Sequence, residues 1–204
     1  MKVALIDYGA GNLRSVANAL GAIGIEPVCT SLPADLAGAT HLVLPGVGSF
    51  GDCMAQLTAR GLVEPLREWV MAGRPFLGIC LGYQLLFDSS EESPGVPGLG
   101  LVRGTVRRFS ASPGVKIPHM GWNSVLPRRP EAAHWAGLGA EPYFYYVHSY
   151  FPVPEDDAII AAETTYGGTT FAAAIERPTL LACQFHPEKS QATGLRLIQN
   201  FFGR

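Results

Sequence analysis

The chain has 204 residues, of which 48 % are hydrophobic and 16 % are charged, a composition typical of a globular rather than a disordered protein. Its 15 basic and 17 acidic side chains leave a net charge of −2, which provides no bulk attraction to nucleic acid or to an acidic membrane surface. We therefore expect one globular domain over residues 1–204, with no nucleic-acid partner and no membrane partner.

The first half of the chain alternates short apolar strands with amphipathic helices. Residues 3–6 form an apolar run typical of a buried strand, and residues 12–24 repeat apolar side chains with helical spacing. The predicted elements that follow are strands at 27–30 and 42–44, a helical stretch at 51–73 with a break near Gly61, a strand at 74–79 and a helix that begins at 83–87. This alternation predicts parallel β-α-β units with right-handed crossovers.

The second half is rich in strands with little helix between them, a pattern that predicts hairpins and antiparallel pairing. We expect strands at 101–109, 142–147, 158–166, 171–176 and 180–185, and a closing helix at 188–202. The whole pattern favours a single open α/β domain whose sheet is mixed, mainly parallel and flanked by helices. In such a fold the functional site lies at the carboxyl ends of the parallel strands.

The four cysteines, Cys29, Cys53, Cys80 and Cys183, show no C-x-x-C or finger-like spacing, so we expect no metal site. Cys29 and Cys183 lie in apolar runs and are expected to be small core residues. The apolar run after Lys2 is too short for a signal peptide, and no run reaches membrane-spanning length. A cytoplasmic protein with reduced thiols is the prediction.

Cys80 stands where a predicted strand turns into a predicted helix. Gly78 and Gly82 lie two residues to either side, which is the spacing of a nucleophile elbow with sulfur in place of the usual serine oxygen. Small neighbours permit the strained turn, and the start of a helix favours a negatively charged thiolate. The alternative is a buried core cysteine, a frequent fate of a cysteine in an apolar run.

A reactive thiolate needs a base and a group that orients the base. The strand predicted at 180–185 ends in His186, Pro187 and Glu188. Residues two apart in extended backbone share a face, so the carboxylate of Glu188 can hold one ring nitrogen of His186 while the other faces the sulfur. The alternative is a histidine and a surface glutamate that flank a turn before the last helix.

Several segments resemble a known family. The segments GICLGYQ at 78–84 and QFHPE at 184–188 resemble the two signatures of the class-I, triad-type glutamine amidotransferases, and LPGVGSF at 44–50 is similar to the glycine-rich oxyanion strand of that family. The opening segment 6–16 and the segment PHMGWN at 118–123 look like one branch of it, the glutaminase subunits of imidazole glycerol phosphate synthases. The resemblance runs from residue 3 to about residue 202.

The resemblance implies hydrolysis of the side-chain amide of glutamine without a cofactor. Cys80 would be the nucleophile, His186 the general base and Glu188 the group that orients it. The N–H groups of Leu81, which directly follows the nucleophile, and of Val47 would stabilise the oxyanion. The residues expected to contact glutamine are Gly46, Gly48, Gln84, Ser149 and Tyr150.

The same resemblance implies a partner, the cyclase subunit of imidazole glycerol phosphate synthase, which would form a heterodimer with this chain and use its ammonia. The residues expected at the docking face are Asn12, Arg14, Trp122, Asn123 and Lys189. An exposed tryptophan and arginine would suit an interface hot spot. The alternative for Trp122 is burial in its own core.

Three other functions stay open at this point. A sister amidotransferase that feeds a different acceptor would share the triad, a free-standing cysteine hydrolase or peptidase would need no partner, and a regulatory subunit would need no triad. A dinucleotide site is not expected, because Arg14 stands where the glycine fingerprint that starts at Gly9 needs its last glycine. His148 is expected to be pocket wall or core rather than a base.

Overall fold

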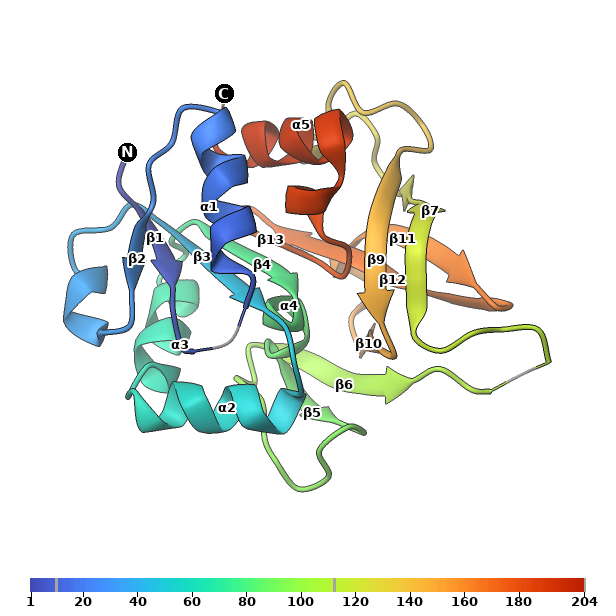
Figure 1. The fold of residues 1–204 in the computed structure, drawn as a ribbon, viewed down its shortest axis with the longest axis horizontal. Coiled ribbons are helices and arrows are strands. Elements are labelled where there is room, and N and C mark those ends of the chain that lie inside the picture. The colour runs from blue at the N-terminus through green and yellow to red at the C-terminus, as the bar shows by residue number, and fades with distance from the viewer. Residues whose placement is uncertain (10, 112, 204) are drawn as a thin grey trace.

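The computed structural model describes residues 1–9, 11–111 and 113–203, so Ala10, which belongs to the opening motif, lies outside the described residues. The main sheet has the strand order β2-β1-β3-β4-β13-β12-β11-β8 (Figure 1). Its strands are β2 (Val28–Thr30), β1 (Val3–Ile6), β3 (His41–Gly46), β4 (Phe76–Cys80), β13 (Leu180–Cys183), β12 (Thr169–Arg177), β11 (Ile160–Tyr166) and β8 (Leu126–Pro127). The strands from β2 to β13 pair in parallel, and β12, β11 and β8 pair antiparallel. The mixed, mainly parallel sheet predicted from the sequence is confirmed.

Helices cover both faces of this sheet. Helices α1 (Leu13–Ala22) and α5 (Gln191–Phe201) pack on one face, and α2 (Phe50–Ala59) and α3 (Val63–Met71) pack on the other (Figure 1). Alternate residues of β1 enter the two cores, with Val3 and Leu5 on the α1 side and Ala4 and Ile6 on the α2 side. Burial of both faces explains why these strands read as continuous apolar runs.

Two smaller sheets lie beside the main one. Strands β10 (Tyr150–Pro154), β6 (Val102–Arg108) and β5 (Phe87–Ser90) form one, and the antiparallel pair of β7 (His119–Ser124) and β9 (Tyr143–His148) forms the other. Figure 1 shows β7, β9 and β10 together on the right side of the molecule. A single antiparallel bridge between Tyr145 and His186 connects β9 to the segment that follows β13. The β7–β9 pair is called the ribbon below.

Some sequence predictions were wrong. The helix after Cys80, α4, covers only Leu81–Gln84. The carbonyl groups of Leu85 and Leu86 accept backbone hydrogen bonds from the segment 99–102, which ends the helix and allows β5 to begin at Phe87. Cys29 is exposed rather than part of the core, whereas Cys183 is buried as predicted. Strands β5, β7, β8 and β10 had not been predicted.

No helix in residues 1–9, 11–111 and 113–203 is long and apolar enough to cross a membrane. In the same ranges no cluster of three or more histidine, cysteine, aspartate or glutamate side chains has a geometry that could hold a metal ion.

Candidate active site

The candidate site forms where three parallel strands end at the same edge of the sheet. β3 and β4 pair with Gly46 opposite Cys80, and β4 and β13 pair with Ile79 opposite Cys183. Because β13 runs parallel to β4, the chain that leaves β13 reaches the same edge, and His186 arrives beside Cys80. Both side chains line a pocket of about 280 Å³.

Cys80 sits on the sharp turn that its neighbouring glycines predicted. Its φ is 55° and its ψ is −109°, a left-handed conformation that a non-glycine residue adopts only under strain. A Cβ atom at Gly82 would collide with the carbonyl oxygen of Leu44, so the elbow packs directly on β3. Glycine is therefore needed at position 82 to bring the turn after β4 against β3.

The imidazole of His186 is held by Glu188. Nδ1 of His186 lies 2.8 Å from Oε1 of Glu188, and the two side chains are only 2 % and 1 % exposed. The backbone N–H of His186 donates to the carbonyl of Tyr145 on the ribbon at 2.9 Å. Nε2 of His186 is buried and forms no hydrogen bond with the described residues, and it is the ring nitrogen left for Cys80.

The electrostatics of this trio favour a protonated His186. Burial alone would lower the pKa of His186, but the neighbouring sulfur of Cys80 and the contact with Glu188 outweigh burial and raise that pKa to about 10. At neutral pH the imidazole therefore holds its proton beside Cys80 and Glu188.

Removal of the sulfur is expected to change this balance. In the Cys80→Ala variant the pKa of His186 should fall below about 10, because burial still lowers it and only Glu188 still raises it. A titration of the ring followed by NMR measures the change. The same substitution at Cys53, which does not touch His186, should leave the titration as it is in the native chain. An unchanged pKa in Cys80→Ala would show that sulfur and imidazole do not interact.

Most residues predicted to contact the oxyanion or glutamine line the same pocket. The members of that set are Val47, Gly48, Leu81, Gln84, Ser149 and Tyr150. As the first residue of α4, Leu81 has an N–H group with no partner inside the helix. The side chain of Gln84 is 4 % exposed, and its Nε2 donates to the carbonyl of Tyr150 at 3.0 Å.

Gly46 has a different place from the one predicted. It does not belong to the described residues that line the pocket. A Cβ atom there would lie 2.8 Å from the nitrogen of Gly82, 2.8 Å from Cβ of Leu81 and 2.7 Å from Oη of Tyr8. Close packing against the elbow, rather than contact with a ligand, therefore explains this glycine.

Two further polar residues at the site had not been predicted from the sequence. Glu92 provides the carboxylate in the described pocket lining, and its Oε2 accepts the N–H of Phe50 at the start of α2 at 2.7 Å. Gln184, which is fully buried, places its Nε2 3.7 Å from Sγ of Cys80 and accepts from Nε2 of Gln84 at 3.0 Å. The QFHPE segment includes Gln184, but nothing in the local sequence around Glu92 marks it.

The predicted docking residues divide into two groups. Arg14, Trp122 and Lys189 are exposed, and Trp122 is 47 % exposed rather than buried in the core. The amide oxygen of Asn12 accepts the N–H of Ser15 and caps α1, and the amide of Asn123 is bonded inside the protein.

Comparison with known proteins gives consistent similarities. Residues 4–204 match the family model described as glutamine amidotransferase class-I. The chain is 51 % identical over 207 residues to the imidazole glycerol phosphate synthase subunit HisH of Syntrophotalea carbinolica, with 98 % of each chain covered. It is 49 % identical over 199 residues to the subunit of the same name from Thermosynechococcus vestitus, with 98 % of this chain and 95 % of that protein covered.

Solved structures share the fold. The structure of PurLQS from Thermotoga maritima aligns with a TM-score of 0.78 at 19 % identity and covers 99 % of this chain and 97 % of that one. A crystal structure of a glutamine amidotransferase aligns with a TM-score of 0.74 at 23 % identity and covers 100 % of this chain and 98 % of that one.

Proposed function

This chain belongs to the class-I glutamine amidotransferase family, and we propose that it works as the glutaminase subunit of an imidazole glycerol phosphate synthase in histidine biosynthesis. The observation that carries the chemistry is the meeting of Cys80 with the buried His186–Glu188 pair in one pocket. We further propose that residues 1–204 act as one amidotransferase domain in the cytoplasm.

The first half of the proposed reaction begins from a Cys80 thiolate beside the protonated imidazole of His186. The thiolate of Cys80 attacks the carbon of the glutamine side-chain amide and forms a tetrahedral intermediate. His186, already protonated, gives its proton to the departing nitrogen, and ammonia leaves as the carbon–nitrogen bond breaks. A thioester between Cys80 and the glutamyl group remains.

The second half needs His186 as a base. When the sulfur is bound in the thioester, it no longer carries the negative charge that raised the pKa of His186. The neutral imidazole takes a proton from water, and the resulting hydroxide attacks the thioester and releases glutamate. Glu188 holds the ring through Nδ1 in both halves, so Nε2 keeps facing the reacting atoms.

Negative charge develops on an oxygen in both steps, and two backbone N–H groups are placed to meet it. We propose Leu81 and Val47 as the donors, because both line the pocket and Leu81 follows the nucleophile at a helix start. Gly48 has a φ of 101° and no atom within 4 Å of an added Cβ, so the backbone beside Val47 has room to reorient.

Glu92 is proposed to bind the α-ammonium group of glutamine, since it is the carboxylate of the described pocket lining. The Glu92→Gln variant keeps an oxygen for the N–H of Phe50 but loses the charge, so the KM for glutamine should rise about tenfold with little change in kcat. Steady-state kinetics measure both constants.

The matched control is Glu91→Gln. Glu91 also accepts a backbone N–H, that of Arg108 at 2.7 Å, but it lies outside the described pocket lining. The KM of Glu91→Gln for glutamine should therefore stay within about twofold of the native value. Equal effects of the two variants would contradict the assignment of Glu92.

The proposed partner is the cyclase subunit, which would receive the ammonia. The exposed candidates for the docking face are Arg14, Trp122 and Lys189. Met120, which lies on β7 with Trp122, is 62 % exposed. Asn12 and Asn123 are proposed for the same face, although their side chains also form hydrogen bonds within the chain.

The test of the proposed function combines partner and substrate. The chain should co-purify with the cyclase subunit and, in that complex, convert glutamine to glutamate while leaving peptides intact. Peptide hydrolysis without a partner would favour a free-standing hydrolase. Stable binding to a different synthase subunit, with none to the cyclase, would favour a sister amidotransferase.

A further inference from the structure

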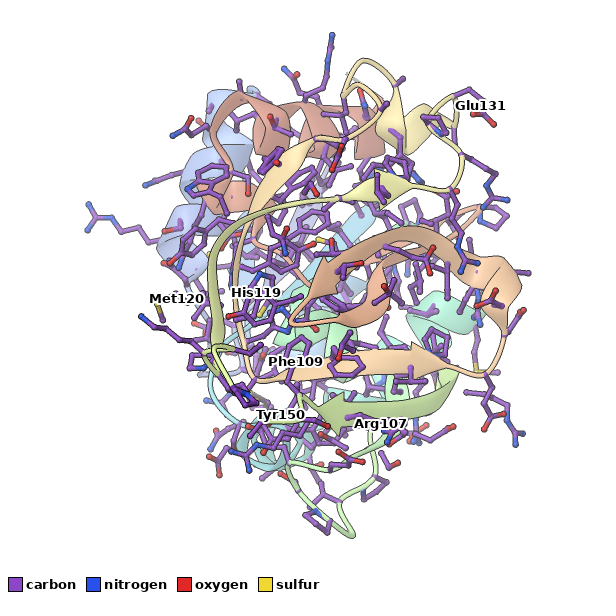
Figure 2. The ribbon with its side chains drawn as sticks, turned by 90° about the vertical axis from the view of Figure 1, so that its right-hand side faces the viewer. Arg107, Phe109, His119, Met120, Glu131 and Tyr150 are labelled. Atoms are coloured by element: carbon purple, nitrogen blue, oxygen red, sulfur yellow. The ribbon has the colours of Figure 1, made fainter. Side chains whose placement is uncertain are left out.

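A pair of buried histidines, one of which lines the pocket, has no part in the mechanism above. His119 on β7 and His148 at the end of β9 are 2 % and 6 % exposed, and Nδ1 of His119 lies 3.0 Å from Nε2 of His148. The ring of His119 is stacked between Tyr146 and Tyr166, with centroids 4.6 and 3.9 Å away. Figure 2 shows His119 inside the molecule beside Phe109, with Met120 at the edge.

The hydrogen bonds around this pair fix the position of each proton. The amide of Asn123 has a set orientation, because its Oδ1 accepts the N–H of Ser124 at 2.8 Å and its Nδ2 donates to the carbonyl of Thr165 at 3.0 Å. The same Nδ2 lies 3.3 Å from Nε2 of His119, which must therefore accept. A neutral His119 then carries its proton on Nδ1 and donates to Nε2 of His148.

The hydrogen bond at the His148 end of the pair is consistent with this arrangement, in which His119 donates and His148 accepts. Nδ1 of His148 lies 2.8 Å from the carbonyl oxygen of Tyr150, which can only accept, so the proton of His148 is on Nδ1 and its Nε2 is free to accept from His119. Burial, the first cause for both rings, lowers the pKa of His119 to about 4 and of His148 to about 3, so both rings are neutral at pH 7.

The chain of hydrogen bonds continues to the nucleophile. The carbonyl of Tyr150 also accepts from Nε2 of Gln84 at 3.0 Å, the same Nε2 donates to Oε1 of Gln184, and Gln184 reaches Sγ of Cys80. The side chains or backbone of His148, Ser149, Tyr150 and Gln84 line the pocket itself. The carbonyl of Tyr150 therefore accepts two side-chain hydrogen bonds, one from His148 and one from Gln84.

We propose that His119 is a positioning residue for glutamine, which acts through His148 to hold the pocket wall at residues 148–150 against Gln84. The inference rests on the proposed function, since it assigns a role in binding the same substrate. Without the donor on His119, the buried Nε2 of His148 has no partner, and His148 is stabilised by moving its proton to Nε2. That tautomer can no longer donate to the carbonyl of Tyr150, which is then held by Gln84 alone of its two side-chain donors.

Two variants separate hydrogen bonding from packing. His119→Phe keeps a flat ring between Tyr146 and Tyr166 but removes the donor, whereas His119→Asn keeps a donor near the position of Nδ1 but removes the ring. In the complex with the cyclase subunit, His119→Phe should raise the KM for glutamine about tenfold with a much smaller change in kcat. His119→Asn should stay within about twofold of the native KM, although its thermal midpoint falls. The reverse order would overturn the proposal.

The matched control is His134→Phe. His134 is a partly buried histidine whose ring bonds to Glu176, but it lies outside the described pocket lining. The KM of His134→Phe for glutamine should therefore equal that of the native chain. If His134→Phe raises the KM as much as His119→Phe does, the effect is a general loss of stability and the proposal fails.

Site-resolved labelling of Cys80 tests the pocket without turnover. A chloroketone analogue of glutamine should label His119→Phe about tenfold more slowly than the native chain, while iodoacetamide, which needs no glutamine site, should label Cys80 at the native rate. Equal loss with both reagents would place the damage in the triad, and no loss with either would remove any role for His119. Failure of the chloroketone to label the native chain would instead contradict the proposed function.

The tautomers give a test in the native protein, which does not depend on any variant folding. ¹⁵N NMR of the histidine rings should show the proton on Nδ1 in both His119 and His148. A proton on Nε2 of either ring would overturn the proposal.

Discussion

The Cys80→Ala variant is expected to lose glutamine hydrolysis by about 10⁴-fold or more in the complex with the cyclase subunit. No other described side chain at the pocket is a thiol, and neither His186 nor Glu92 is placed to take the role of the sulfur. Members of a catalytic unit give non-additive losses, so adding His186→Ala should reduce the rate by less than about another tenfold. Ammonia release and glutamate formation measure the effect, and thermal unfolding should show that the variant is folded.

The other cysteines provide the controls for this prediction. Cys29 is exposed, whereas Cys53 and Cys183 are buried, so a general alkylating reagent can reach Cys29 while a chloroketone analogue of glutamine should modify Cys80 alone. Cys29→Ala should keep full activity. Modification of Cys53 or Cys183 by the glutamine analogue, or substantial activity in Cys80→Ala, would contradict the assignment of the nucleophile.

The elbow and the parallel half of the sheet could be predicted because their physical requirements are local. Strands buried on both faces must be continuously apolar, as at residues 3–6, and a nucleophile on a left-handed turn needs small residues beside it, as Gly78 and Gly82 show. Placing His186 beside Cys80 needed one further inference, that the last strand runs parallel to the strand of Cys80.

Strand β7 of the ribbon was missed because its pattern is inverted, whereas β9 matches the strand predicted at 142–147. On β7 the outward residues Met120 and Trp122 are apolar and exposed, whereas the inward residue His119 is polar and buried. Strands are usually predicted from apolar side chains that point inward, so the sequence of this segment does not predict a strand. The inversion makes sense if the outer face meets a partner and the inner face carries the hydrogen bonds to the pocket wall.

Glu92 and Gln184 could not be assigned from the sequence for a different reason. Glu92 follows β5 in a turn, and its role depends on contact with the start of α2, far away in the chain. Gln184 reaches Cys80 only because β13 lies against β4. Neither side chain belongs to a periodic pattern, so only the assembled fold reveals it.

The isolated chain is expected to be a poor glutaminase that the cyclase subunit and its ligand accelerate by at least about 10²–10³-fold, the usual loss when one oxyanion donor is missing. The segment that carries Val47, the proposed second donor, makes few hydrogen bonds among the described residues. Val47 is 40 % exposed, and the one described donor to its carbonyl is Sγ of Cys53 at 3.6 Å, a weak donor, while Gly48 beside it has a φ of 101°. The backbone at Val47 can therefore reorient at small expense in free energy when a partner docks.

Two substitutions test whether this N–H group is the switch. Val47→Pro removes the N–H and should abolish the acceleration by the partner, whereas Val47→Ala keeps the N–H, loses only an exposed side chain and should be accelerated as the native chain is. Steady-state kinetics of each chain, alone and with the cyclase subunit and its ligand, measure the ratio of the two rates, and co-purification checks that both variants still bind. Full activity of the isolated native chain, or undiminished acceleration of Val47→Pro, would show that docking does not act through this donor. If only Val47→Pro loses the acceleration, the oxyanion is fully stabilised only in the complex. Ammonia is then released at a high rate only when the subunit that uses it is present.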